Sequence, residues 1–218
     1  MERLKINSHI NLHADRWSIQ HIEMIYASGT IITQKPTQEV KLCHDGDIPY
    51  IIKKYLSKNI FQSLRELLGK ARSDKSFNSA LTLQALSIPI PNHYMVAKQI
   101  SVNRSKSYLV MERAPGTPLI KFLQSGNFDD LPEITELHII DIVETFHNAN
   151  LAHGDLHTRN LIIANDGSVS LIDLDNVEKS PSRIRRDVRR LHQALIDYPN
   201  PMHKLQQYLA IRLEITSS

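Results

Sequence analysis

The sequence predicts an α+β fold built from two lobes, a small β-rich N-lobe over residues 1–113 and a truncated helical C-lobe over 114–218. In the first half, β-forming residues follow a His-Asp-Gly-Asp turn cluster, which is typical of strands joined by a hairpin. The second half instead shows apolar residues at helical spacing. A Pro- and Gly-rich linker at 114–118 separates the two patterns and sets the expected boundary.

Composition excludes several classes of protein. The chain has 218 residues, with 41% hydrophobic and 22% charged residues, which is ordinary globular usage. A net charge of +3 is too small to indicate a nucleic-acid partner. One cysteine, Cys43, permits no disulfide within the chain, has no nucleophile signature, and fits a reducing compartment. The N-terminus has no apolar signal region and no run of 18 apolar residues occurs, so we expect a cytoplasmic protein.

The elements of the N-lobe can be placed in order. Residues 22–55 are predicted as strands with turns between them, because short β-forming runs alternate with Gly, Pro and Asp-Gly breaks. Residues 58–86 carry apolar residues at helical spacing and are predicted as two helices separated near Gly69. Two further strands are expected at 95–100 and 107–112.

The C-lobe is predicted to be helical apart from one hairpin. Residues 133–150 form an amphipathic helix whose apolar stripe is Ile134, Leu137, Ile140, Val143 and Phe146. Strands at 161–164 and 169–172 flank an Asn-Asp-Gly-Ser turn, which is a strong hairpin signal. Two more helices are expected at 182–198 and 202–215.

Three polar residues around that hairpin carry the candidate chemistry. Asn160 lies just before its first strand and Asp173 just after its second, so the hairpin should bring them together. A carboxylate and a carboxamide that converge can bind a hard divalent cation through oxygen. Asp155, in the loop before Asn160, would accept a hydroxyl proton, and phosphoryl transfer needs these parts.

A simpler interpretation is that these are turn residues, since Asp and Asn favour turns through local hydrogen bonds. That explains Asn165 and Asp166 in the hairpin turn. It does not explain an acidic residue between Ile172 and Leu174, where a buried carboxylate is costly unless it is paired or bound to metal.

The loop 153–160 (HGDLHTRN) and the segment around Asp173 resemble the catalytic loop and metal-binding strand of the protein-kinase-like superfamily. The resemblance implies that Asp155 is the catalytic aspartate and that Asn160 and Asp173 hold Mg²⁺ with ATP. It also implies a supporting role for His153. Gly154, in place of an arginine, is similar to small-molecule kinases rather than regulated protein kinases.

The nucleotide-gripping half resembles the superfamily less closely. Residues 50–53 resemble the strand whose lysine contacts the ATP phosphates. Neighbouring strand residues face opposite sides, so only one of Lys53 and Lys54 can face the cleft, and the position of the match favours Lys53. A solvated strand lysine is the alternative. Glu112, at the end of a predicted strand, is a further candidate for nucleotide binding. No G-x-G-x-x-G precedes these lysines, and Ser28-Gly29-Thr30 is a candidate for a shortened phosphate-covering turn.

Within the superfamily, residues 45–195 resemble the bacterial lipopolysaccharide kinase group, which includes kinases of the core sugars Kdo and heptose. Only about 45 residues follow Asp173, without the Ala-Pro-Glu sequence of protein kinases. The predicted helix around 76–84 lacks the usual glutamate, so either Glu66 replaces it or the lysine works without an ion pair. The resemblance implies an ATP- and Mg²⁺-dependent phosphotransferase acting on a sugar hydroxyl of lipopolysaccharide core.

The arginine-rich segment 182–190 has two candidate roles. By resemblance, Asp187 would brace the catalytic loop by accepting its backbone N–H groups; alternatively, Asp187 pairs with an arginine one turn away. The arginines would contact a phosphorylated sugar or the anionic inner-membrane surface, which makes peripheral membrane contact a candidate. A solvated basic helix face is the plainer interpretation.

Two other functions remain open from the sequence. One is a compact RIO-like protein kinase. The other is a pseudokinase, a nucleotide-binding module or scaffold without turnover, which the missing glycine-rich loop and helix glutamate would favour.

Overall fold

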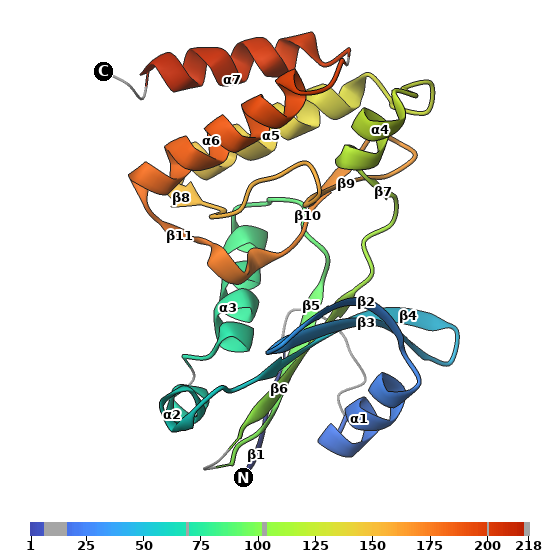
Figure 1. Ribbon diagram of the computed structural model, residues 1–218, viewed down its shortest axis with the longest axis vertical. Helices are drawn as coiled ribbons and strands as arrows, with labels where there is room; N and C mark the ends of the chain where they lie inside the picture. Colours follow the sequence, from blue (N-terminus) through green and yellow to red (C-terminus); the bar gives the residue numbers. More distant parts are fainter. Residues whose placement is uncertain (7–16, 69, 102–103, 200, 216–218) are drawn as a thin grey trace. The chain divides into compact units, whose positions relative to one another are not determined.

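The computed structural model describes residues 1–6, 17–68, 70–101, 104–199 and 201–215 (Figure 1). The chain divides into two compact units: residues 1–80 with 91–113, and residues 81–90 with 114–218. One division between the units falls after residue 113. Residues 81–90, however, group with the second unit rather than the first. The Pro89 carbonyl accepts the Leu171 N–H at 2.9 Å, which ties this segment to the second unit.

The first unit is built on one antiparallel sheet of six strands in the order β1-β5-β6-β4-β3-β2 (Figure 1). The strands are β1 (Glu2–Ile6), β2 (Thr30–Lys35), β3 (Gln38–Asp45), β4 (Ile48–Leu56), β5 (His93–Gln99) and β6 (Lys106–Glu112). In the centre, Lys53 of β4 pairs with Val40 of β3 and Leu109 of β6. The strands expected at 95–100 and 107–112 are therefore confirmed within a residue or two.

Helix α1 (Ile19–Ala27) covers one face of this sheet, where the sequence predicted a strand from residue 22. That prediction is wrong, because Ile19, Ile22 and Ile25 repeat at helical spacing and are buried together. The Ser18 hydroxyl begins the helix by accepting the His21 N–H at 3.1 Å. A short apolar run cannot be assigned to helix or strand by its periodicity alone.

The two helices expected in residues 58–86 are confirmed as α2 (Ile60–Leu67) and α3 (Arg72–Ala85). Asp74, in the first turn of α3, forms a buried ion pair with Lys98 of β5. Met95 and Ala97 belong to the core under α1, so alternation along β5 puts Lys98 on the opposite face of the sheet. The start of α3 is therefore linked, through the Asp74–Lys98 ion pair, to the face of the sheet opposite α1.

The second unit is mainly helical, with three short β pairings. Its elements are β7 (Thr117–Pro118), α4 (Leu119–Ser125), α5 (Ile134–Asn148), β8 (Leu151–Ala152), β9 (Leu161–Ile163), β10 (Val169–Leu171), η2 (Leu174–Asn176), β11 (Glu178–Lys179), α6 (Pro181–Ile196) and α7 (His203–Ile215). Helix α7 packs on both α5 and α6 (Figure 1). The predicted hairpin is confirmed as β9–β10, with Leu161 opposite Leu171. A mixed fold of a sheet-based unit and a helical unit confirms the α+β prediction.

The predicted apolar stripe of α5 is confirmed at Val143 and Phe146, which are buried, but not in the first half of the helix. Ile134 and Leu137 are 43% and 44% exposed, whereas Ile139 and Ile142 are buried with Val143. The sequence contains apolar residues at both sets of helical positions, and contacts with the hairpin and α7 decide which set is buried. In the described part of the chain, no helix has the length and apolar character needed to cross a membrane.

Candidate active site

The loop between β8 and β9 is held from α6 by one carboxylate. Asp187, which is 3% exposed, accepts the Gly154 N–H at 2.8 Å and the Leu156 N–H at 3.2 Å. Each carboxylate oxygen takes one of these bonds, and hydrogen bonds to a charged acceptor are among the stronger ones. The loop that carries Asp155 is thus fixed on both sides of that residue.

His153 anchors the same loop to the hairpin. Its ring is 1% exposed, and Nε2 lies 3.0 Å from the Ile172 carbonyl oxygen. Burial lowers the pKa of His153 below its ordinary value, against the opposing effect of Asp187. The imidazole is therefore neutral at pH 7, and Nε2–H donates to Ile172.

Asn160 and Asp173 come together because the pairing of the hairpin continues past its strands. The Ile172 N–H donates to the Asn160 carbonyl at 2.9 Å, so Asp173 immediately follows a residue paired with Asn160. Asp173 has φ +64° and ψ +60°, in the left-handed region. For a residue with a side chain this costs about 1–2 kcal/mol, and such strain is found preferentially at functional sites.

The donor groups at this end of the hairpin fit a magnesium ion. Asn160 Nδ2 donates to the Asp155 carbonyl oxygen at 2.9 Å, which turns the amide oxygen away from that carbonyl. The amide oxygen and the Asp173 carboxylate are hard ligands, and Mg²⁺ typically takes one or two carboxylates beside water and phosphate oxygens. Among the described residues, no three His, Cys, Asp or Glu side chains form a metal cluster, so a dedicated all-protein cage is not present there.

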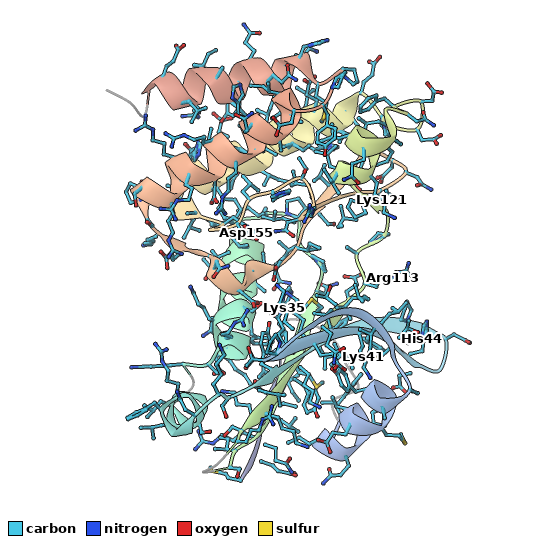
Figure 2. The ribbon with its side chains drawn as sticks, in the orientation of Figure 1. Lys35, Lys41, His44, Arg113, Lys121 and Asp155 are labelled. Carbon is cyan, nitrogen blue, oxygen red and sulfur yellow. The ribbon has the colours of Figure 1, made fainter. Side chains whose placement is uncertain are left out.

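Asp155, labelled in Figure 2, is paired with an arginine that the sequence did not single out. Arg190 Nη1 of α6 lies 2.9 Å from Asp155 Oδ1, with both side chains partly exposed. Arg190 follows Asp187 by one helical turn, so the same face of α6 supplies both contacts to the loop. The spacing of Asp187 and Arg190 in the sequence was the only available signal, and the neighbouring arginines obscured it.

Gly154 is required by the shape of the loop. Its φ is +80°, and a Cβ at this position would lie 2.7 Å from both Cβ and the carbonyl oxygen of Asn176. No larger residue fits without displacing that backbone. This explains physically why the arginine found at this position in protein kinases is absent.

In the first unit, Lys53 and Lys54 lie on opposite faces of β4, as strand alternation requires. The Lys54 ammonium lies over the Tyr26 ring at 5.3 Å and the Tyr108 ring at 5.9 Å, on the face that α1 covers. Lys53 is only 7% exposed and belongs to the other face. The contact of Lys53 with nucleotide phosphates stays a prediction.

The structure also shows the surroundings of three other N-lobe residues considered in the sequence analysis: Glu112, Gly29 and Cys43. The Glu112 carboxylate accepts the Asn92 backbone N–H at 3.0 Å and the Asn92 amide at 2.9 Å, so it holds the segment before β5; its nucleotide contact stays a prediction. Gly29 lies between Ser28, the C-cap of α1, and the start of β2 at Thr30; the hairpin turn is instead Pro36-Thr37, between β2 and β3. Cys43 is buried, which raises its thiol pKa to about 11.

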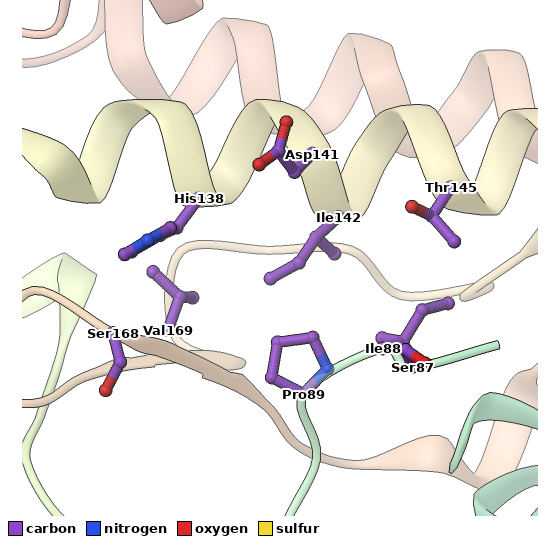
Figure 3. A pocket seen from close by; sticks show the side chains of 9 residues that line it. All are labelled: Ser87, Ile88, Pro89, His138, Asp141, Ile142, Thr145, Ser168 and Val169. Atoms are coloured by element: carbon purple, nitrogen blue, oxygen red, sulfur yellow. The ribbon is translucent and has the colours of Figure 1, made fainter. Parts of the chain in front are cut away.

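A cavity of about 330 Å³ lies elsewhere in the second unit, between α5, the segment 87–89 and the β9–β10 hairpin (Figure 3). His138 lines it and is fixed by a 2.8 Å contact between Nδ1 and the Gly167 carbonyl oxygen. None of the predicted site residues lines this cavity, so it is separate from the constellation around Asp155.

Comparison with known proteins places these features in a family. A solved structure of WaaP in complex with acyl carrier protein superposes with a TM-score of 0.66, covering 99% of this chain and all of that one, at 14% identity. Two curated relatives match in sequence: the EKC/KEOPS complex subunit BUD32 of Enterocytozoon bieneusi, 29% identical over 134 residues, and a probable serine/threonine-protein kinase, SCO3848, of Streptomyces coelicolor, 28% identical over 120. The matches cover 56% and 51% of this chain but only 61% and 18% of those proteins. The model of the lipopolysaccharide kinase (Kdo/WaaP) family matches residues 31–210. The two-unit kinase fold, the anchored loop and this match lead to one conclusion: the chain belongs to the lipopolysaccharide kinase (Kdo/WaaP) family.

Proposed function

We propose that this protein transfers the γ-phosphoryl group of ATP to a sugar hydroxyl of lipopolysaccharide core. The observation that carries the proposal is the placement of Asp155 and Asn160 on one loop, which Asp187 holds, and of Asp173 directly after Ile172, which pairs with Asn160. Membership of the family supports the lipopolysaccharide acceptor. Preorganised groups of this kind lower the barrier to phosphoryl transfer chiefly by positioning and electrostatics.

Asp155 is the proposed proton acceptor. Its Oδ1 receives Arg190, and its backbone carbonyl receives Asn160, so the carboxylate is oriented from two sides. Within the described residues Oδ2 makes no hydrogen bond, and it would face the acceptor hydroxyl. As the new oxygen–phosphorus bond forms and the bond to ADP breaks, the hydroxyl proton passes to Asp155.

The remaining roles follow from donor chemistry. Asn160 and Asp173 would hold Mg²⁺, which supplies charge neutralisation for the nucleotide phosphates when it is bound. Lys53 would hold the phosphates as a buried cation; Glu112 remains a weaker candidate for the nucleotide. His153 and Asp187 act as positioning residues, since both contact the loop rather than a reactant.

The test is ATP turnover with purified lipopolysaccharide core acceptors, comparing the wild type with Asp155→Asn. Loss of a general base should slow transfer roughly 10²- to 10⁴-fold. Asp166→Asn is the matched control, because Asp166 is exposed in the hairpin turn and its carboxylate accepts hydrogen bonds from the backbone and hydroxyl of Ser168. Transfer at the wild-type rate by Asp155→Asn and by Asp173→Asn would contradict the proposal.

A protein acceptor is the second candidate, because one relative is a probable serine/threonine-protein kinase. Labelled phosphate on protein and none on glycolipid would favour it. Stabilisation of the fold by Mg-ATP without any transfer would instead indicate a nucleotide-binding pseudokinase.

Contact with an anionic membrane surface also stays a prediction. Arg186 and Arg189 are exposed on α6 and would face such a surface. Their replacement by glutamine should weaken binding to anionic vesicles and leave transfer to a water-soluble core sugar unchanged.

A further inference from the structure

Helix α2 of the first unit presents large apolar side chains to solvent. Phe61 is 76% exposed, Leu64 52% and Leu68 60%. They follow one another by three and four positions, so they share one face of the helix. The Leu68 N–H donates to the Leu64 carbonyl at 3.0 Å, so the helical path continues as far as Leu68. A surface helix usually turns such a face toward the core, and α2 does the reverse.

The side of α2 that contacts the rest of the first unit is polar. Ser63 lies two residues after Phe61, on the other side of the helix, and is 4% exposed. Its hydroxyl lies 2.9 Å from the Ser57 hydroxyl and accepts the Ser105 N–H at 3.4 Å. The Ser57 hydroxyl accepts the same N–H at 2.8 Å. These buried hydrogen bonds fix α2 with its apolar face outward.

Basic residues accompany this apolar face. Segment 58–72 has a net charge of +3, from four basic residues and one acid: Lys58, Arg65, Lys70, Arg72 and Glu66. Arg65 follows Phe61 by four positions, so it is exposed on the same face, and Lys70 is also exposed. Phe and Leu on one face with Lys and Arg beside them are typical of helices that lie in a membrane interface.

We propose that α2 lies in the interface of an anionic lipid bilayer. Phe61, Leu64 and Leu68 would enter the boundary between headgroups and acyl chains, and Arg65 and Lys70 would contact lipid phosphates. The polar contacts of Ser63 would stay within the protein.

The size and charge of the face favour a bilayer over a protein partner. A stable protein interface takes about 20–30 residues from each side, whereas three apolar side chains with basic neighbours suffice for an interfacial helix. The net positive charge of segment 58–72 complements the negative surface of anionic lipids. Contact through α2 differs from that of the α6 arginines because it inserts apolar side chains, and it does not depend on the proposed transfer activity.

A tryptophan at position 61 reports insertion directly. The chain has one tryptophan, Trp17, which is only 6% exposed. The emission of Phe61→Trp should shift to shorter wavelength with phosphatidylglycerol vesicles, and brominated acyl chains should quench it; phosphatidylcholine vesicles should do neither. Met24→Trp is the matched control, because Met24 is 63% exposed on another helix of the same unit, α1. No response in Phe61→Trp, or an equal response in Met24→Trp, would overturn the proposal.

Affinity gives a second readout. Phe61→Ser combined with Leu64→Ser should weaken cosedimentation with phosphatidylglycerol vesicles about tenfold or more, because two apolar side chains no longer leave water. Both side chains are more than half exposed, so the melting temperature should not change. The control is Met24→Ser with Ile48→Ser, which removes two exposed apolar side chains elsewhere in the unit. Equal affinity of the two double variants would contradict insertion by α2.

Other occupants of this face give different results. Self-association of the wild type without lipid, lost in Phe61→Ser with Leu64→Ser, would assign the face to a second copy and overturn the proposal. No binding of the wild type to anionic vesicles would overturn it as well. Asp155→Asn should bind vesicles as the wild type does, and the Phe61/Leu64 double variant should phosphorylate a water-soluble core sugar at the wild-type rate. Lipid contact and the proposed transfer activity can therefore fail separately.

Discussion

Asp187 offers a sharp test of how the catalytic loop is held. Replacing it with asparagine keeps the size of the side chain, removes the charge, and turns one of two acceptor oxygens into a donor. One of the contacts, to Gly154 at 2.8 Å or to Leu156 at 3.2 Å, must then be lost. A hydrogen bond to a charged group contributes about 1.5–3 kcal/mol, against a total of about 5–15 kcal/mol for a domain.

Backbone hydrogen exchange reads this loss locally. The amides of Gly154 and Leu156 should exchange roughly 10- to 100-fold faster in Asp187→Asn, because the opening free energy falls by that contribution. The control is Asp197→Asn, at the exposed C-terminal end of the same helix, where the carboxylate accepts only a bond from Gln193 among the described residues. Wild-type exchange at both amides in Asp187→Asn would refute the bracing role.

Three further predictions follow from the same geometry. Burial lowers the pKa of His153 in the folded protein. The neutral imidazole therefore stabilises the fold above the unfolded-state pKa of about 6.5, and this contribution is lost as the pH falls below that value. In urea titrations, the free energy of unfolding should fall less steeply with decreasing pH in His153→Asn than in the wild type. Gly154→Ala should cost at least about 2 kcal/mol of unfolding free energy, from strain and overlap together. Gly126→Ala, at φ +66° with no atom near the added Cβ, should cost about 1 kcal/mol. Lys53→Met should weaken Mg-ATP binding about tenfold, while Lys54→Met, on the opposite face, should not; equal affinities measured by calorimetry would remove Lys53 from the site.

Much of the hairpin and its polar residues could be predicted, because the signals are local. Asn-Asp-Gly-Ser between two β-forming runs specifies a tight turn, and Asn160 and Asp173 then meet by strand geometry alone. The helix before the loop was also predicted, with the buried residues of its second half, but not those of its first half, because contacts with the hairpin and α7 select them.

Features that depend on distant contacts were not predictable in the same way. Helix α1 looked like a strand because Ile22 to Tyr26 is a short apolar run, and only the sheet beneath it decides the outcome. The ion pair of Arg190 with Asp155 joins residues 35 positions apart, and nothing in the sequence distinguishes Arg190 from the neighbouring arginines. The requirement for glycine at position 154 follows from its close approach to Asn176, which the sequence does not show.

The measurement that tests the central claim most directly is transfer of labelled γ-phosphate from ATP to lipopolysaccharide core, by the wild type and by Asp155→Asn. The wild type should label the glycolipid in the presence of Mg²⁺, and Asp155→Asn should bind Mg-ATP but label roughly 10²- to 10⁴-fold more slowly. Labelling by Asp155→Asn at the wild-type rate would contradict the assignment of Asp155 as the proton acceptor.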